Sequence, residues 1–144
     1  METKRIKISD TKNINDEELK EAAQILRDGG LVAFPTETVY GLGGNALDEK
    51  AAGKIYAAKG RPSDNPLIVH IYRAEDLVPI TRVVPQAAYD LAKAFWPGPL
   101  TMILNKSDKV PYETTGGMDT VAIRMPSNRI AAEMIRTGGG FIAA

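Results

Sequence analysis

The chain has no cysteine and only one histidine among its 144 residues, and these absences exclude several kinds of chemistry. Without cysteine there is no disulfide, no thiolate metal site and no thiol nucleophile. A single histidine also argues against a structural zinc site. Long apolar runs are missing too, so no segment has the length of a membrane span, and the expected location is the cytoplasm.

The chain also lacks a net charge, because 18 basic residues balance 18 acidic ones. No overall field therefore draws the protein to nucleic acid or to an anionic membrane, and any anion site must be local. Neither a Ser/His/Asp constellation nor the carboxylate pair of a hydrolase stands out in the sequence. Both of these absences count against a hydrolase.

What the sequence does contain is an alternation of helix and strand patterns over one domain, residues 1–144. Four helices are predicted from residues that cap or start a helix: Asn15, Asp48, Pro85 and Ser127. Short apolar segments predict strands, with a polar loop at 105–117, and these strands cover residues 4–8, 31–34, 67–71, 100–104, 120–124 and 141–144. We expect residues 31–34 to form a buried strand. The alternation predicts an α/β domain with a mixed sheet.

The densest group of polar side chains lies in residues 59–70, which hold two cations and the histidine. Lys59 and Arg61 form either a solvated turn or a clamp for phosphate or carboxylate oxygens. Asn65 adds an amide that can donate to a phosphate or accept from an adenine amino group. His70 ends a predicted strand and is either a satisfied, half-buried histidine or a substrate contact.

Two further groups of polar side chains accompany predicted strands. Residues 36–40, Thr-Glu-Thr-Val-Tyr, provide either a helix cap or a grip on an amino acid. The glycines that follow match neither a P-loop nor a dinucleotide fingerprint. In the strand at 120–124, Thr120 and Arg124 share a face, and Arg124 is either a residue that reaches solvent or a partner for a carboxylate. Together these groups predict a site for phosphates and an amino acid.

Four stretches of this sequence, taken in their order along the chain, form a pattern that covers almost its entire length: residues 29–43, 59–70, 96–101 and 120–126. Together they closely resemble the YrdC-like family, the threonylcarbamoyl-adenylate synthases. The resemblance implies a twisted mixed sheet with flanking helices around a positively charged cavity. Members of this family join L-threonine, bicarbonate and ATP into threonylcarbamoyl-adenylate and release pyrophosphate. A separate transferase complex then passes the threonylcarbamoyl group to tRNA.

The resemblance also implies roles for particular residues, carried over by position. Three residues would bind threonine: Thr38, His70 and Arg124. Four would face bicarbonate and the ATP phosphates: Lys59, Arg61, Asn65 and Thr120. Of these, Lys59 and Arg61 would be the catalytic cations. Mg²⁺ is expected to accompany ATP, held chiefly by phosphates and water, and no metal ligand is assigned to the protein.

One part of the family pattern is missing from the sequence. A Ser-x-Asn element that follows a Gly-x-x-x-Ala-type strand is not found before Ala144. We therefore expect a domain that is incomplete at its C-terminus. We also expect the 144-residue chain to be inactive or very weak as a synthase by itself.

Two other functions fit parts of the pattern. A non-enzymatic YrdC-like module would bind RNA or tRNA through a basic concave face, but zero net charge and few aromatic residues predict weak binding. A carbamoyl-transfer domain, like that of hydrogenase-maturation proteins, would use another carbamoyl donor. Such domains usually belong to much longer chains with acylphosphatase and zinc-finger segments, which are not visible in this sequence.

Overall fold

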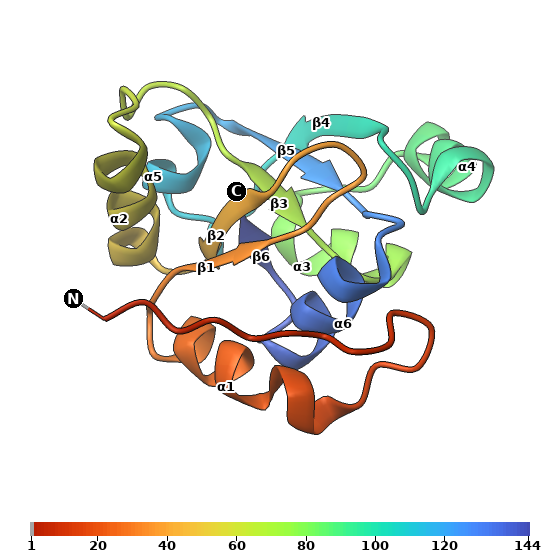
Figure 1. Ribbon diagram of the computed structural model, residues 1–144. Coiled ribbons are helices and arrows are strands. Elements are labelled where there is room, and N and C mark those ends of the chain that lie inside the picture. The colour runs from red at the N-terminus through yellow and green to blue at the C-terminus, as the bar shows by residue number, and fades with distance from the viewer. Residues whose placement is uncertain (1) are drawn as a thin grey trace.

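A six-stranded mixed sheet with helices on both faces organises residues 2–144, which the computed structural model describes (Figure 1). The strands lie in the order β1-β2-β6-β3-β5-β4. Their bounds are β1 (Val32–Phe34), β2 (Gly41–Asn45), β3 (Ile68–His70), β4 (Thr101–Asn105), β5 (Thr120–Arg124) and β6 (Ile142–Ala143). The helices are α1 (Asp16–Arg27), α2 (Glu49–Lys59), α3 (Leu77–Ile80), α4 (Gln86–Phe95), α5 (Tyr112–Thr115) and α6 (Arg129–Thr137), with a 3-10 turn at Ala74–Asp76. The predicted α/β class with a mixed sheet is confirmed.

The direction of the central strands decides which residues meet. β3 and β5 are parallel neighbours, so their carboxyl ends, His70 and Arg124, lie side by side. β6 lies between β2 and β3 and is antiparallel to both, with Ile142 opposite His70. The strand predicted at the end of the chain is therefore confirmed, and it lies in the middle of the sheet.

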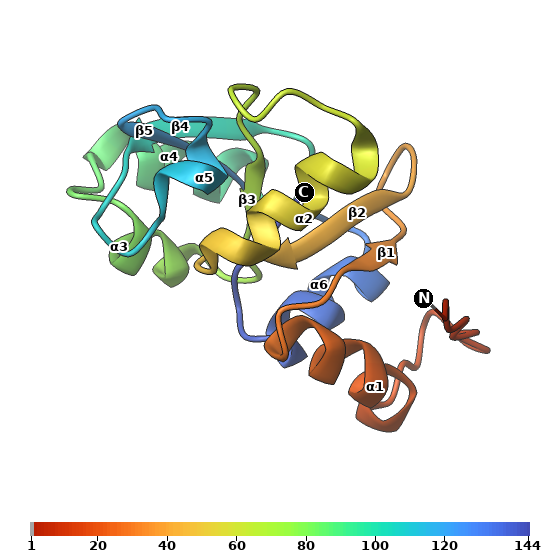
Figure 2. The ribbon, with the colours of Figure 1, turned by 90° about the vertical axis from the view of Figure 1, so that its left-hand side faces the viewer.

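Helices cover the two faces of the sheet unequally. On one face, α2, α3 and α4 pack over side chains such as Val69 and Ile123, and together they form the larger core. On the other face, α1 and α6 pack over Phe34 and Ile142 in a smaller core. Because α1 and α6 lie side by side at one end of the molecule (Figures 1 and 2), they leave the same face of β5 and β4 without a helix.

The starts of α1 and α2 follow the predicted caps, and those of α4 and α6 differ by one residue. The side chains of Asn15 and Asp48 each accept a hydrogen bond from an amide in the first turn of α1 and α2. α4 begins at Gln86, so Pro85 lies just before the helix and not, as expected from the sequence, in its first turn. The last helix begins one residue later than predicted, because Asn128 caps α6 and Ser127 does not. The Asn128 side chain reaches two amides of the first turn, and this satisfies donors that a helix leaves unpaired at its start.

The strand predicted at residues 4–8 is wrong. This segment forms no ladder and runs past α1 (Figure 1), where Lys4 makes an ion pair with Glu21. Ile6 stays 37% exposed, so the segment covers no core. Alternating apolar residues favour a strand only where a neighbouring strand supplies hydrogen bonds and a packing surface.

Other differences concern the hairpin of β1 and β2 and the segments around β4. β1 is an edge strand whose Ala33 is exposed, and so it is not the buried strand expected. The sequence does not predict β2, since Gly-Leu-Gly-Gly-Asn lacks β-branched residues. A Cβ at Gly43 would lie 2.6 Å from the Phe34 ring, so glycine here allows close packing.

The helical turns at residues 74–80 were not predicted, and the predicted polar loop at 105–117 contains α5.

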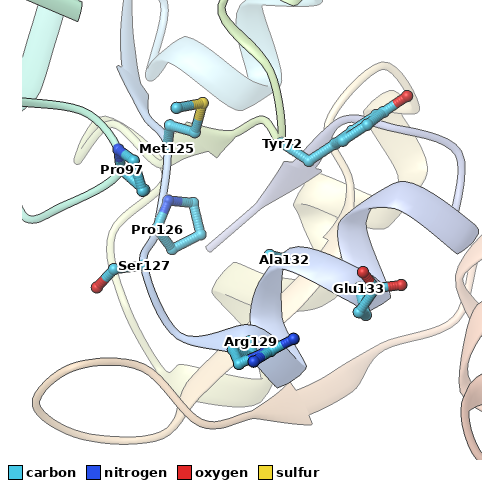
Figure 3. A pocket seen from close by; sticks show the side chains of 8 residues that line it. All are labelled: Tyr72, Pro97, Met125, Pro126, Ser127, Arg129, Ala132 and Glu133. Atoms are coloured by element: carbon cyan, nitrogen blue, oxygen red, sulfur yellow. The ribbon is translucent and has the colours of Figure 1, made fainter. Parts of the chain in front are cut away.

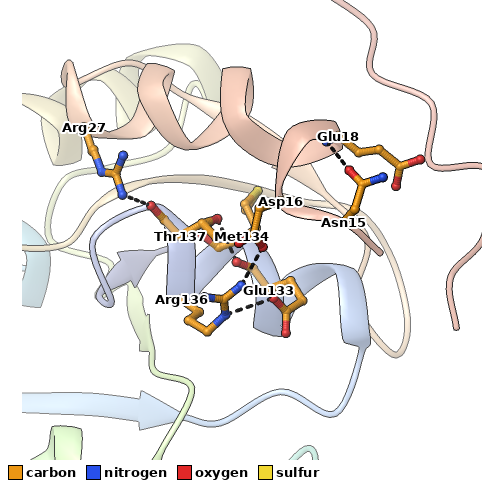
Figure 4. A network of polar contacts seen from close by, with 8 residues as sticks. All are labelled: Asn15, Asp16, Glu18, Arg27, Glu133, Met134, Arg136 and Thr137. Carbon is orange, nitrogen blue, oxygen red and sulfur yellow. Dashed lines mark hydrogen bonds and ion pairs between the residues drawn. The ribbon is translucent and has the colours of Figure 1, made fainter. Parts of the chain in front are cut away.

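Polar contacts join α1 to α6 on the outside of the smaller core (Figure 4). Arg136 of α6 bonds Asp16 of α1 at 2.7 Å and Glu133 of its own helix at 2.7 Å. Arg27 of α1 donates to the carbonyl of Thr137. These contacts fix the end of α6, from which the chain enters β6. Within residues 2–144, no helix is long and apolar enough to cross a membrane.

Candidate functional site

The candidate site is the uncovered face of β5 and β4, together with the adjoining end of β3, where His70 is buried. Along β5, Val121 and Ile123 are buried in the larger core, while the alternate side chains are only partly buried. On β4, Ile103 is 67% exposed, although it lies in the middle of the strand. Because successive side chains point to opposite faces, these alternate positions define a sheet face that is open to solvent.

His70 lies at one end of this face and is 4% exposed. Its Nδ1 lies 3.0 Å from the carbonyl oxygen of Ile68 and 3.3 Å from that of Ile142. A carbonyl can only accept, so Nδ1 carries the proton and Nε2 is left as an acceptor. The Phe34 ring packs edge-on against the imidazole with centroids 6.0 Å apart. Burial lowers the pKa of His70, and the charge of Arg124 lowers it further, so the ring is neutral at pH 7.

Arg124 lies beside His70 and is held by β4. Its Nε donates to Thr101 Oγ1 at 2.9 Å, and Thr101 is its register partner across the β4–β5 pair. The hydroxyl fixes one side of the guanidinium, which has further N–H groups for a ligand. A neutral acceptor and a fixed cation thus lie together at the carboxyl ends of β3 and β5. This pairing suits an α-amino acid, whose ammonium donates and whose carboxylate accepts.

The segment from Lys59 to Asn65 lies before the amino end of β3. α2 ends at Gly60, whose φ of 61° is left-handed, and the next amide, that of Arg61, bonds back to the helix at 3.1 Å. Tyr56 Oη donates to the carbonyl of Asn65 at 2.8 Å, which fixes the other end of the loop. In the part of the chain that the structure describes, the side chains of Lys59 and Arg61 make no hydrogen bond or ion pair. The backbone is therefore held while both cations stay available for a ligand.

Thr120 begins β5, and it faces the same side of the sheet as Arg124. Because β3 and β5 are parallel, the amino end of β5 lies next to the segment that enters β3. Thr120 therefore lies at the same end of the strands as Asn65, whose side chain is exposed. Arg124 lies four residue steps along the strand from Thr120, a distance of roughly 13 Å. The predicted site residues thus form two groups, one at each end of these strands.

Thr38 lies in the loop between β1 and β2, residues 35–40, and its side chain is exposed. The loop is organised by Thr36, whose hydroxyl accepts from the Thr38 amide at 3.2 Å and donates to the carbonyl of Val39. Within residues 2–144, no hydrogen bond joins Thr38 to His70 or to Arg124. The structure therefore brings His70 and Arg124 together directly, and it places Thr38 on a separate loop.

Glu37 provides the link between this loop and the segment after β5. Its Oε1 accepts from the amide and hydroxyl of Ser127 and from the amide of Asn128. Partial burial raises the pKa of Glu37, but these hydrogen bonds outweigh it and leave the pKa below its ordinary value. Sequence reasoning did not assign Ser127 and Thr101 to the site. The register of an antiparallel β4–β5 hairpin is the signal that could have found Thr101.

Two surface hollows, of about 280 and 340 Å³, lie outside this face. The first, drawn in Figure 3, follows the carboxyl ends of β3 and β5 and includes Tyr72, Met125 and Arg129. The second lies between α2 and α5 and includes Tyr56 and Asp64. Neither is lined by a predicted site residue. Among residues 2–144, no group of three or more histidine, aspartate or glutamate side chains is placed to hold a metal ion.

Comparison with known proteins identifies relatives of this chain. The model of the Sua5/YciO/YrdC family, described as "Telomere recombination", matches residues 24–144. The threonylcarbamoyl-AMP synthase of Pyrococcus abyssi is 55% identical over 131 residues, which are 91% of this chain and 38% of that protein. The threonylcarbamoyl-AMP synthase of Bacillus subtilis is 51% identical over 147 residues, which cover 100% of this chain and 42% of that protein.

A solved structure agrees with these relatives. The crystal structure of P. abyssi Sua5 complexed with L-threonine is 55% identical to this chain and superposes with a TM-score of 0.89. The match covers 92% of this chain and 39% of that one. This chain thus spans about two fifths of the length of these relatives. By sequence and by fold, the chain belongs to the Sua5/YciO/YrdC family.

Proposed function

We propose that this chain carries the substrate-binding sheet of a threonylcarbamoyl-AMP synthase. The observation that carries the proposal is the adjacency of His70 and Arg124 on an open sheet face, with Lys59 and Arg61 at the opposite edge. Relatives at 51% and 55% identity are threonylcarbamoyl-AMP synthases, and one was crystallised with L-threonine, which supports this substrate.

L-Threonine occupies the end of the face at the carboxyl ends of β3 and β5. The Arg124 guanidinium pairs with the substrate carboxylate, because a planar cation with several N–H groups suits two carboxylate oxygens. His70 accepts a hydrogen bond at Nε2, from the substrate ammonium or hydroxyl. Thr38 closes over the substrate from the β1–β2 loop. Burial of His70 and its two carbonyl contacts support a fixed ring orientation.

ATP and bicarbonate occupy the other end of the face. Lys59 and Arg61 neutralise phosphate and bicarbonate oxygens, and Asn65 and Thr120 donate to the same groups. This assignment is supported by the fixed backbone between Tyr56 and Asn65 and by the unpaired state of both cations within residues 2–144. A loop that is already ordered loses less entropy when it binds an anion.

The chemistry requires positioning and charge neutralisation more than covalent help. The amine of threonine adds to bicarbonate and gives a carbamate with loss of water. A carbamate oxygen then attacks the α-phosphorus of ATP, a new P–O bond forms, and pyrophosphate leaves. Lys59 and Arg61 stabilise the negative charge that collects on the phosphoryl oxygens. The product then passes to a transferase complex that modifies tRNA.

Mg²⁺ enters as part of the substrate, bound to ATP. Magnesium in phosphoryl-transfer sites keeps several waters and is held largely by substrate phosphates. The described chain offers no carboxylate cluster for it, which is compatible with a nucleotide-borne ion. We therefore assign no protein ligand to the metal.

Pyrophosphate release tests the function in a chimera, where this chain replaces the matching segment of the B. subtilis relative. Release should require both L-threonine and bicarbonate. Replacing Lys59→Ala together with Arg61→Ala should abolish it, because two phosphate-facing cations are lost. The matched control, Lys20→Ala with Lys93→Ala, also removes two exposed cations, but from α1 and α4, and should keep the activity. A folded chimera that releases no pyrophosphate, beside an active B. subtilis enzyme, would contradict the proposal.

A further inference from the structure

Apart from the two strands that it joins, the β1–β2 loop is held to the rest of the protein by hydrogen bonds of one residue, Glu37. Its other polar contacts, among the residues that the structure describes, run inside the loop and involve Thr36. The contacts that leave it all end on Glu37 Oε1, which receives three hydrogen bonds from Ser127 and Asn128. Ser127 Oγ donates at 2.7 Å and the Asn128 amide at 3.1 Å. A carboxylate that accepts from backbone amides makes a stronger bond than a neutral group would.

Ser127, the partner of Glu37, lies close in sequence to the predicted threonine-binding residue Arg124. Ser127 lies three residues beyond Arg124, in the segment that joins β5 to α6. In Figure 1 the loop between β1 and β2 reaches toward this segment. The Asn128 side chain caps two amides in the first turn of α6, so the start of this helix provides a fixed anchor for the carboxylate.

The loop has little else to hold it. The side chains of Glu37, Thr38, Val39 and Tyr40 are exposed, with Val39 and Tyr40 at 73% and 74%. Val39 and Tyr40 therefore bury little apolar surface that could hold the loop in place of the carboxylate. The charge of Glu37 also acts on His70, and this places the carboxylate near the threonine end of the face.

We propose that Glu37 is the positioning residue of the threonine site: its carboxylate holds loop 35–40 against the start of α6, so that Thr38 faces the substrate beside His70 and Arg124. This inference rests on the function proposed above. Glu37 itself touches no substrate in this scheme. Its loss should weaken the binding of L-threonine and leave the ATP end of the site, at the other edge of the sheet, unchanged.

Hydrogen exchange of the 144-residue chain tests the anchor without any substrate. Glu37→Ala should speed the exchange of amides in residues 36–40, while amides of β3 and β5 keep their protection. Glu37→Gln should give an intermediate result, since its amide oxygen still accepts but carries no charge. The matched control is Glu17→Ala, which removes an exposed carboxylate from α1. Unchanged exchange in loop 35–40 of the Glu37→Ala protein would show that the anchor is not what orders the loop.

Steady-state kinetics of the chimera test the link to threonine. Glu37→Ala should raise the KM for L-threonine about 10- to 100-fold, the effect of losing charged hydrogen bonds, and leave the KM for ATP within about two-fold. Ser127→Ala removes only the hydroxyl donor and should have a smaller effect in the same direction. A general structural fault would instead raise both KM values or lower kcat alone, and either result would overturn the proposal.

The two experiments separate the possible failures. If the parent chimera has no threonine-dependent activity, the proposed function fails, and the exchange experiment alone decides whether Glu37 orders the loop. If the parent is active and Glu37→Ala loosens the loop without changing the KM for threonine, the positioning role is wrong and the proposed function stands.

Discussion

His70 and Arg124 are register partners on parallel strands, and their side chains leave the same face of the sheet. Burial lowers the pKa of His70, and the charge of the neighbouring Arg124 lowers it further. One residue therefore supplies a permanent positive charge and its neighbour a neutral acceptor. In the proposed function, this division of roles gives the pair two different partners on L-threonine, its carboxylate and its ammonium or hydroxyl group.

The stability of the protein should depend on pH through His70. Burial, and then the charge of Arg124, lower the pKa of His70 from its ordinary 6.5, so the unfolded chain binds the proton more readily than the folded one. Stability is therefore fully present above about pH 7 and falls as the pH drops through 6.5 toward the lowered value. Urea unfolding at several pH values between about 7.5 and 5.5 measures this slope.

The variant His70→Gln should flatten that slope, although it lowers stability at neutral pH by removing a packed ring. This pH dependence can be assigned to His70, because the chain has one histidine and carboxyl groups titrate at lower pH. Equal slopes for His70→Gln and the parent between those pH values would show that another group is responsible.

Arg124 should be sensitive even to a conservative change. Arg124→Lys keeps the charge but loses the fork that can bind Thr101 and a carboxylate together. We expect the affinity for L-threonine to fall by about 1.5–3 kcal/mol, the worth of a hydrogen bond to a charged group. Calorimetric titration of the chain with L-threonine measures the change.

Two further variants complete that test. Thr101→Val should lower the affinity for L-threonine less than Arg124→Lys does, because it removes the hydrogen bond that holds the guanidinium and not the guanidinium itself. Arg73→Lys, at an exposed arginine that pairs with Asp76, is the matched control and should bind threonine normally. The assignment of Arg124 to the threonine carboxylate fails if Arg124→Lys binds as tightly as the parent.

Much of the fold follows from local sequence. The apolar strands around Val69 and Ile123 and the capping residues Asn15 and Asp48 all act within a few residues of themselves, so their effects are visible in the sequence. β2 is different, because its glycines are required by the Phe34 ring that packs across the hairpin. Such a reason is tertiary, and no local propensity reports it.

The candidate site also combines residues that the local sequence indicates with contacts that only the fold creates. Residue types and strand ends indicated that His70 could contact a substrate and that Arg124 could bind a carboxylate. The order and pairing of the strands make these two residues neighbours. The bond from Ser127 to Glu37 spans 90 residues, and the expected cap at Ser127 was wrong because Asn128 takes that role. The positive charge of the site as a whole stays a prediction.

Asn128 should matter for stability in a way that Ser127 does not. The Asn128 side chain caps two amides of α6, so Asn128→Ala should lower the free energy of unfolding by about 1 kcal/mol. Asn128→Asp preserves the acceptor and adds a charge that suits a helix start, so it should retain most of the stability. Urea unfolding of both proteins distinguishes these outcomes. A loss in Asn128→Asp as large as that in Asn128→Ala would contradict the capping role.

Gly116 should affect the proposed ATP end of the site from a distance. A Cβ at Gly116 would lie 2.7 Å from the carbonyl oxygen of Asp64 and 3.1 Å from the nitrogen of Pro66. Both atoms belong to the backbone of the segment between Lys59 and β3, so Gly116→Ala must move the loop that carries Arg61. We therefore expect a several-fold higher KM for ATP in the chimera.

Gly117 provides the matched control for this change. Both glycines have left-handed backbones, with φ of 64° at Gly116 and 83° at Gly117, so alanine costs roughly 1–2 kcal/mol of stability at either position. At Gly117, however, a Cβ meets nothing within 4 Å. Gly117→Ala should therefore lose similar stability but bind ATP normally, and both variants should keep the parent's KM for L-threonine, because His70 and Arg124 lie at the far end of the strands. If the two variants raise the KM for ATP equally, backbone strain and not the collision with Asp64 is the cause, and the loop does not depend on Gly116 for its position.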